Sequence, residues 1–263
     1  KVWLCAKLFD QQDKNGNWFG VKIMEISYNT KTALTLMSCN FGFEIAKELN
    51  DYLEESVFDK NIDASGSLVG QIKNHENSAQ LIFPHDDDDV GQQFSEYLCR
   101  LANQYMGYTE SDAVSDGTFV NSSVTGNEKK YDPKVKSMWV NRSYAGDYNP
   151  EHDHPSDADI GLSCIMYLTI PMGISSGDGS LGSTSLTGAS GVTDGYTRFC
   201  WGTNTTSDMK KLKPSTEQYV KPEVGQLLMF PSWLNHSVLP FTGEGERRSL
   251  SANINMFPVE EEE

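Results

Sequence analysis

The sequence has few cysteines, few basic residues and no long apolar run. Its five cysteines are widely spaced and form no CxxC pair, which is typical of reduced thiols rather than of a disulfide framework. The apolar runs are much shorter than the ~20 residues that cross a bilayer. Lysine and arginine number 21 against 37 aspartates and glutamates, and the net charge of −16 disfavours a nucleic acid or an anionic membrane as partner. We therefore expect a cytoplasmic protein that binds neither.

The composition is that of a folded chain. With 263 residues it can form one large domain or two small ones, and it needs neither disulfides nor a metal to bury a core. A hydrophobic content of 38 %, with 11 % aromatic residues, is too high for a disordered chain. No repeat with a period of about 20 to 50 residues is present, which disfavours a solenoid or a propeller.

The N-terminal part mixes predicted strands and helices. Residues 2–28 contain two runs of strand formers around Asn15-Gly16, a sequence that favours a tight turn, so a β-hairpin is predicted there. Apolar residues at helical spacing predict one helix over 43–57 and a second over 94–106. The four aspartates before the second helix would lie at the positive end of its dipole.

From residue 135 onward, almost every patterned segment predicts a strand. The predicted strands are 135–142, 162–170, 197–201, 226–230, 236–241 and 249–257. Several short strands with few helices favour a sandwich or jelly roll, with the earlier helices packed on its outer face. The segment 173–195, rich in Gly, Ser and Thr, is expected to be a surface excursion. We expect an α+β part over 1–134, a β core over 135–257 and an acidic tail over 258–263.

Three of the five histidines lie in the strand-rich part of the chain. In an extended segment the side chains at i and i+2 share a face, so His152 and His154 can reach one metal ion while Asp153 points away. His236 begins a predicted strand, from which its imidazole can complete a facial metal site. The alternatives are two exposed histidines in a turn and a hydrogen-bonded core histidine at position 236.

The last predicted strand has one polar face and one apolar face. The polar face carries Arg247, Ser249, Ser251, Asn253 and Asn255, whereas the other is apolar apart from Arg248. The polar face meets either bulk water or a pocket. In a pocket, the guanidinium of Arg247 can bind a carboxylate through two hydrogen bonds, and Ser249 can add a third.

These motifs, in this order, resemble the Fe(II)- and 2-oxoglutarate-dependent oxygenases. That superfamily carries HxD/E, a distal histidine and RxS on a double-stranded β-helix. The chain is more similar still to a little-characterised branch from marine bacteria and phages. Its signature segments match Trp139-Val140-Asn141, Asn149 to Pro155, Tyr167-Leu168 and Phe230 to Pro240, and the resemblance covers about residues 135–257.

The resemblance implies a mainly β fold with flanking helices around a double-stranded β-helix core. It implies an oxygenase, expected to be a hydroxylase, that couples decarboxylation of 2-oxoglutarate to oxidation of a small-molecule or peptidyl substrate. By resemblance, His152, His154 and His236 hold Fe(II), and Arg247 and Ser249 hold 2-oxoglutarate. Tyr167 and Asn141 are further candidates for the co-substrate pocket, and Trp233 is a pocket candidate. Because His154 replaces the usual carboxylate, the site has either three histidines or two histidines and a water. The oligomeric state is left open.

Two rival hypotheses and one rival placement stand beside this interpretation. A cupin-like three-histidine dioxygenase would need no Arg247-x-Ser249 motif, and a non-catalytic jelly-roll module would bind no iron tightly. His85-Asp86-Asp87 also spells HxD, but it precedes a predicted helix and no RxS motif follows at the right distance. Packing residues are the alternative for Asn141, Tyr167 and Trp233.

Overall fold

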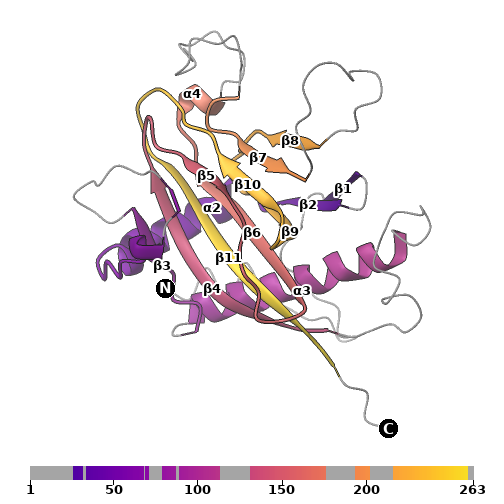
Figure 1. Cartoon of the computed structure of the whole chain (residues 1–263). Helices are drawn as coiled ribbons and strands as arrows, with labels where there is room; N and C mark the ends of the chain where they lie inside the picture. Colours follow the sequence, from indigo (N-terminus) through magenta and orange to yellow (C-terminus); the bar gives the residue numbers. More distant parts are fainter. Residues whose placement is uncertain are drawn as a thin grey trace, which may run out of the picture.

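The computed structural model describes residues 26–31, 34–67, 69–70, 79–86, 89–112, 131–175, 193–201 and 216–259. Most of the predicted hairpin over 2–28, most of segment 173–195 and most of the acidic tail lie outside these ranges. The described residues form two facing β-sheets with helices on one outer side (Figure 1). None of the helices in this part of the chain is long and apolar enough to span a membrane.

The larger sheet has seven strands and the smaller has four, and all paired strands are antiparallel. In spatial order the larger sheet contains β1 (Ile26–Lys31), β2 (Leu34–Asn40), β9 (Gln226–Pro231), β6 (Ile160–Thr169), β11 (Arg247–Pro258), β4 (Tyr131–Ser143) and β3 (Gln80–Ile82). The smaller contains β5 (Asn149–His152), β10 (Asn235–Val238), β7 (Thr197–Cys200) and β8 (Glu217–Val220). The mainly β, double-stranded β-helix fold predicted from the sequence is confirmed.

The predicted strands of the C-terminal part are all present in the two sheets. The strand predicted over 236–241 is shorter, because β10 ends at Val238. Three short strands, β3, β5 and β8, were not predicted, since three or four residues are too few to show a period. Each of them pairs at or near an edge of its sheet, and β3 and β5 both border the site described below.

Strand β11 lies in the middle of the larger sheet, between β4 and β6. Its apolar side chains, Leu250, Ala252, Ile254 and Met256, are buried in the main hydrophobic core. Its polar residues Arg247, Ser249 and Ser251 are buried too. The alternation predicted from the sequence is therefore real, and its polar face meets a cavity rather than bulk water.

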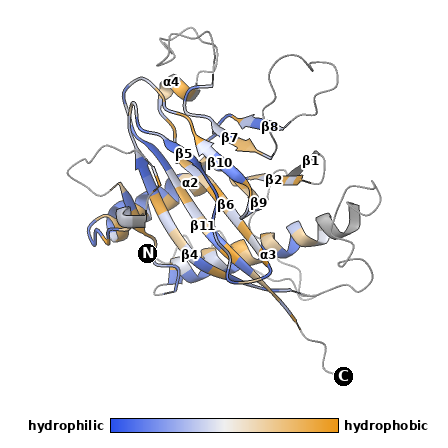
Figure 2. Ribbon diagram, in the orientation of Figure 1, coloured by the Kyte–Doolittle hydropathy of each residue, from blue (hydrophilic) through white to orange (hydrophobic). Residues whose placement is uncertain are grey.

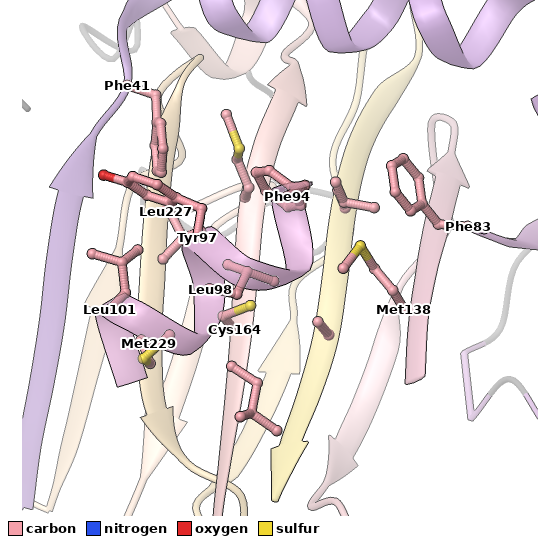
Figure 3. Close-up of a cluster of buried hydrophobic side chains, with 14 of the residues drawn as sticks. Phe41, Phe83, Phe94, Tyr97, Leu98, Leu101, Met138, Cys164, Leu227 and Met229 are labelled. Carbon is pink, nitrogen blue, oxygen red and sulfur yellow. The ribbon is translucent and has the colours of Figure 1, made fainter. Parts of the chain in front are cut away.

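Two helices cover the apolar face of the larger sheet. They are α2 (Gly42–Tyr52), followed by a π-helical turn (Leu53–Val57), and α3 (Asp89–Asp112), and both predicted helices are confirmed. A short α4 (Met172–Ser175) and a 3-10 turn (Ser65–Ser67) lie elsewhere. Apolar and polar residues alternate along α3 (Figure 2), and its apolar side packs onto the sheet. Figure 3 shows Phe94, Tyr97, Leu98 and Leu101 beside Cys164, Leu227 and Met229.

The segment before α3 packs tightly against the helix at Gly91. A Cβ at this position would lie 1.7 Å from the backbone oxygen of Pro84, so only glycine permits this approach. The hydroxyl of Ser95 donates a hydrogen bond of 3.2 Å to the backbone oxygen of His85. Asp89 is the first residue of α3, as expected for the end of the aspartate run. These contacts fix the position of His85.

A buried ion cluster joins the helices to the larger sheet. Arg142 of β4 and Arg248 of β11 lie directly opposite each other, and both bind Glu246, at 2.8 and 2.7 Å. Phe58 lies under both guanidinium groups, and Arg248 also pairs with Glu54 at 2.8 Å. Burial raises the pKa of Glu246, but the hydrogen bonds and charges of the two arginines outweigh it and lower the pKa to about 2.

The substitution Glu246→Gln is expected to destabilise the fold in a pH-dependent way. Removal of the carboxylate leaves two arginines facing each other, which costs roughly 3 kcal/mol at neutral pH. Because the folded pKa lies below the ordinary value of 4.5, the carboxylate stabilises the fold fully above that pH and less as the pH falls toward 2.

Urea unfolding of the wild type and of Glu246→Gln at a series of pH values measures this effect. The difference in unfolding free energy should shrink as the pH falls from 7 to 3. Glu244→Gln, at an exposed residue nearby, is the matched control and should behave as the wild type does. A Glu246→Gln difference that is constant over this pH range would contradict the assignment.

Candidate active site

Three histidines lie close together on the smaller sheet, in the space between it and the larger sheet. His152, the last residue of β5, lies directly opposite His236 of β10 in the strand pairing. His154 follows just outside β5, and its backbone N–H donates a 3.0 Å hydrogen bond to Ser232 in the turn before β10. The ring centroids are 4.3 to 5.1 Å apart, and one nitrogen of each ring lies within 4.8 Å of the others.

Backbone carbonyls orient two of these rings. The Nδ1 of His152 is 2.7 Å from the oxygen of Pro150, and that of His236 is 2.9 Å from the oxygen of Leu234. Because a carbonyl oxygen only accepts, each Nδ1 carries the proton and donates it. The Nε2 lone pair of each ring is therefore left for another partner, which is the arrangement of a metal-bound histidine.

Burial favours the neutral form of two of the three histidines, His154 and His236. Burial and the neighbouring His152 lower the pKa of His154 to about 4 and that of His236 to about 3. Both imidazoles are neutral at pH 7, and the neutral form is the one that binds a metal ion. Asp153 is exposed and is not part of the group, so the donor set within the described residues consists of three imidazoles. This set fits a divalent transition metal such as iron.

A cavity of about 430 Å³ lies between the two sheets and includes the three histidines. Its floor is the polar side of β4, β6 and β11, with Ser137, Asn141, Ser143, Ser163, Ser249, Ser251 and Asn253. No aspartate or glutamate in the described part of the chain lines it. The cavity therefore combines a candidate metal site with a neutral, hydrogen-bonding floor.

Arg247 is the buried charge at one end of this cavity. Its side chain is part of a residue only 2 % exposed, and among the described residues it forms no ion pair with a carboxylate. Its Nε has no hydrogen-bond partner, and its Nη2 donates only a long bond of 3.5 Å to Thr197. Burial lowers the pKa of Arg247, yet a guanidinium stays protonated at neutral pH. Such a cation is costly unless an anion joins it.

The other residues predicted for the co-substrate lie in one row across the sheet. Asn141, Ser249 and Tyr167 are neighbours on β4, β11 and β6. Asn141 and Ser249 line the cavity, and the Oδ1 of Asn141 is buried without a hydrogen-bond partner. Tyr167 does not line it. Its ring lies 5.2 Å from the Arg247 guanidinium and its hydroxyl is 2.7 Å from that of Thr197, so it contacts Arg247 rather than the cavity.

Some residues that line the cavity were not predicted from the sequence. Trp233 is 59 % exposed and does not line the cavity, whereas Trp139 lines it with its ring 5.5 Å from that of His154. His85 and Lys136 also line it, although His85 is not part of the three-histidine group. The alternation along β4 was the available signal for Trp139, but His85 comes close only through the pairing of β3 with β4.

A family model described as "Putative 2OG-Fe(II) oxygenase" matches residues 137–253. The match begins in β4, ends in β11 and includes the three histidines, Arg247 and Ser249. Over these residues the chain is similar to the 2OG-Fe(II) oxygenase family. The resemblance inferred from the sequence is thereby confirmed, together with Fe(II) and 2-oxoglutarate as the cofactors of this oxidoreductase family. The likeness to a branch from marine bacteria and phages stays a prediction.

Several solved structures are similar at low identity. An oxidoreductase of the 2OG-Fe(II) oxygenase family from Burkholderia pseudomallei has 12 % identity and a TM-score of 0.31 over 51 % of this chain and 49 % of that chain, so this chain spans about half its length. The viral collagen prolyl hydroxylase from Paramecium Bursaria Chlorella virus-1, in its 2OG complex, has 16 % identity and a TM-score of 0.43. The match covers 84 % of this chain and 96 % of that chain. HygX from Streptomyces hygroscopicus, with nickel and 2-oxoglutarate bound, has 11 % identity and a TM-score of 0.43. The match covers 86 % of this chain and 83 % of that chain. No curated protein matches.

Loss of one histidine should remove metal binding. In His236→Ala we expect the affinity for Fe(II) to fall by more than the roughly 10- to 100-fold that loss of an outer-shell partner costs. Anaerobic calorimetric titration of the metal-free protein measures it. Asp153→Asn, at the exposed neighbour of the two other histidines, is the control and should bind Fe(II) as the wild type does. Equal weakening in both variants would place the metal elsewhere.

Proposed function

We propose that this oxygenase is a hydroxylase of a small-molecule or peptidyl substrate. In this proposal His152, His154 and His236 hold Fe(II), and Arg247 with Ser249 holds the distal carboxylate of 2-oxoglutarate. The net charge of −16 makes a nucleic-acid substrate unfavourable. The proposal keeps the substrate within these two classes.

The observation that carries the proposal is the position of Arg247. It is a buried cation whose Nε has no partner, on the same wall of the cavity as Ser249 and on the sheet that faces the histidines. A dicarboxylate that reached from the metal to Arg247 would supply the missing anion and form bidentate hydrogen bonds. A structural arginine would instead be expected to have its counter-ion in the fold, as Arg248 has in Glu246.

The residues of the chain then have separate tasks in the reaction. Iron and 2-oxoglutarate together supply an O2-dependent oxidation coupled to loss of CO2, which leaves succinate. Arg247 and Ser249 orient the co-substrate, and Tyr167 and Thr197 hold the Arg247 guanidinium from behind. The Oδ1 of Asn141 is an acceptor for a donor group of the substrate, because ionised 2-oxoglutarate has no donor. The carbonyls of Pro150 and Leu234 orient two of the rings, so that their Nε2 atoms would be available to hold the metal.

The third histidine alters the charge of the proposed metal site. His154 stands where the family pattern has a carboxylate, so the protein contributes three neutral ligands and no negative charge. One more unit of positive charge on the metal strengthens its attraction for an anionic co-substrate. A site with two histidines and a water is the alternative, in which His154 would only border the metal.

Arg247→Ala should weaken 2-oxoglutarate binding by about 30-fold or more, since truncation of one partner of a buried charge pair costs at least ~2 kcal/mol. Calorimetric titration of the Fe(II)-loaded protein without oxygen measures the affinity, and succinate formation measures turnover. Arg100→Ala, at a half-exposed arginine on α3 outside the cavity, is the control and should leave both unchanged.

Other outcomes of the titration and of aerobic turnover assays would count against the proposal. Full affinity and turnover in Arg247→Ala would remove the role assigned to Arg247. Iron binding with O2 uptake but without any 2-oxoglutarate response would favour a cupin-like three-histidine dioxygenase. No iron binding in the wild type would favour a non-catalytic jelly-roll module.

A further inference from the structure

The cavity continues beyond the histidines, away from Arg247. Arg247 pairs with Ser143 at one end of the β4–β11 ladder, and Asn253 pairs with Ser137 toward the other. The six steps from Arg247 to Asn253 along β11 correspond to roughly 20 Å at 3.3 to 3.4 Å per residue. Trp139, whose ring contacts that of His154, lies between the two ends. The histidines are therefore above the middle of the floor, and the far end lies beyond the reach of a ligand held at Arg247.

The far end of the cavity carries two nitrogen donors, Lys136 and His85. Lys136 directly precedes Ser137 on β4, where the pairing with β11 is irregular. Just after β3, the backbone N–H of Phe83 donates a 3.0 Å hydrogen bond to the oxygen of Met138. Because the two segments are antiparallel, the residues that follow Phe83 run toward Lys136. Both side chains line the cavity. The packing at Gly91 and the bond from Ser95 keep the backbone of His85 in place.

At this end the cavity is lined by basic side chains, and their carboxylate partners lie outside it. In a chain with 37 acidic residues, no carboxylate of the described part lines the cavity. Lys136 pairs at 2.8 Å with Asp157, whose side chain is 64 % exposed, and His85 contacts the exposed Asp86 at 3.2 Å. Exposed pairs of this kind contribute little, and an ammonium has three N–H donors. Lys136 can therefore keep Asp157 and still donate to a ligand inside the cavity.

We infer that this end of the cavity is a substrate subsite in which Lys136 and His85 bind an anionic group, a carboxylate or a phosphate, of a small polar substrate. The inference rests on the proposed function, because it assigns Arg247 to 2-oxoglutarate and leaves the far end for the substrate. Ser137 and Asn253 supply neutral hydrogen-bonding groups beside it. A volume of about 430 Å³ suits small-molecule ligands rather than a folded partner.

The spacing also limits which carbon reacts. Lys136 and Trp139 are three residues apart on β4, which corresponds to roughly 10 Å. The anionic group is thus held well away from the metal, and the oxidised carbon lies several bonds from it. Trp139 and Ile82 provide the apolar surface for the part of the substrate in between.

Three six-carbon probes that differ only in the head group test the subsite. Protein loaded with Ni(II), which occupies the metal site without turnover, and with saturating 2-oxoglutarate is titrated with hexanoate, hexyl phosphate and neutral hexanamide. We expect one or both anions to bind more tightly than hexanamide, and the tighter of the two identifies the head group. In Lys136→Gln and His85→Ala the affinity for that anion should fall by roughly 10-fold or more.

Lys134→Gln is the matched control. Lys134 lies on the same strand two residues away, is mostly exposed and does not line the cavity, so this variant should bind the anion as the wild type does. Equal binding of the anions and hexanamide, or full anion affinity in Lys136→Gln, would overturn the inference while 2-oxoglutarate binding still supports the proposed function.

Failure of the proposed function gives a different result. If 2-oxoglutarate does not bind to the wild type, the same probes are titrated into Arg247→Ala, which lacks the other cation of the cavity. Anion binding that is lost on adding Lys136→Gln supports the subsite without the oxygenase role. No anion binding in Arg247→Ala overturns the subsite as well.

Discussion

The arrangement of the cavity depends on a buried positive charge that the fold itself does not neutralise. Arg247 has an aromatic ring and a hydroxyl beside it, but no carboxylate within the described residues. The next residue on either side belongs to the Glu246 cluster, where each arginine has its counter-ion. A buried charge of this kind destabilises a fold until an anion arrives. The cluster fixes β11, which carries Arg247, to its neighbour β4 and to the π-helical turn that follows α2.

The two halves of the site come from different sheets. The histidines belong to or follow β5 and β10, whereas Arg247, Ser249 and Asn141 belong to β11 and β4. Neither sheet alone contains a complete site, so the distance between the sheets determines how a ligand can span from metal to guanidinium. The core that sets this distance includes Phe199 and Phe230, and the ring of Phe230 is 5.0 Å from that of His236. Packing between the sheets is thus also a determinant of ligand geometry.

Local periodicity made much of this predictable. The alternation of β11, the two long helices and the spacing of His152 and His154 are properties of short sequence windows, and the structure brings these two histidines together with His236. The positions of Tyr167, Trp233, His85 and Lys136 depend on strand pairing and turn geometry, which no local pattern contains. The division at residue 134 stays a prediction, since β1, β2 and β3 pair into the same sheet as the later strands. Cytoplasmic location is likewise untested.

The alternation of β11 has a consequence for how such a protein can change. Its apolar side chains from Leu250 to Met256 contribute to the core, and Arg247, Ser249, Ser251 and Asn253, which alternate with them, line the cavity. A substitution of Ser251 or Asn253 alters what the floor can hold and leaves the packing beneath it untouched. Ligand preference and thermal stability are therefore encoded in interleaved but separate positions. Selection can act on one set without eroding the other, so the same sandwich can diversify its chemistry over evolutionary time.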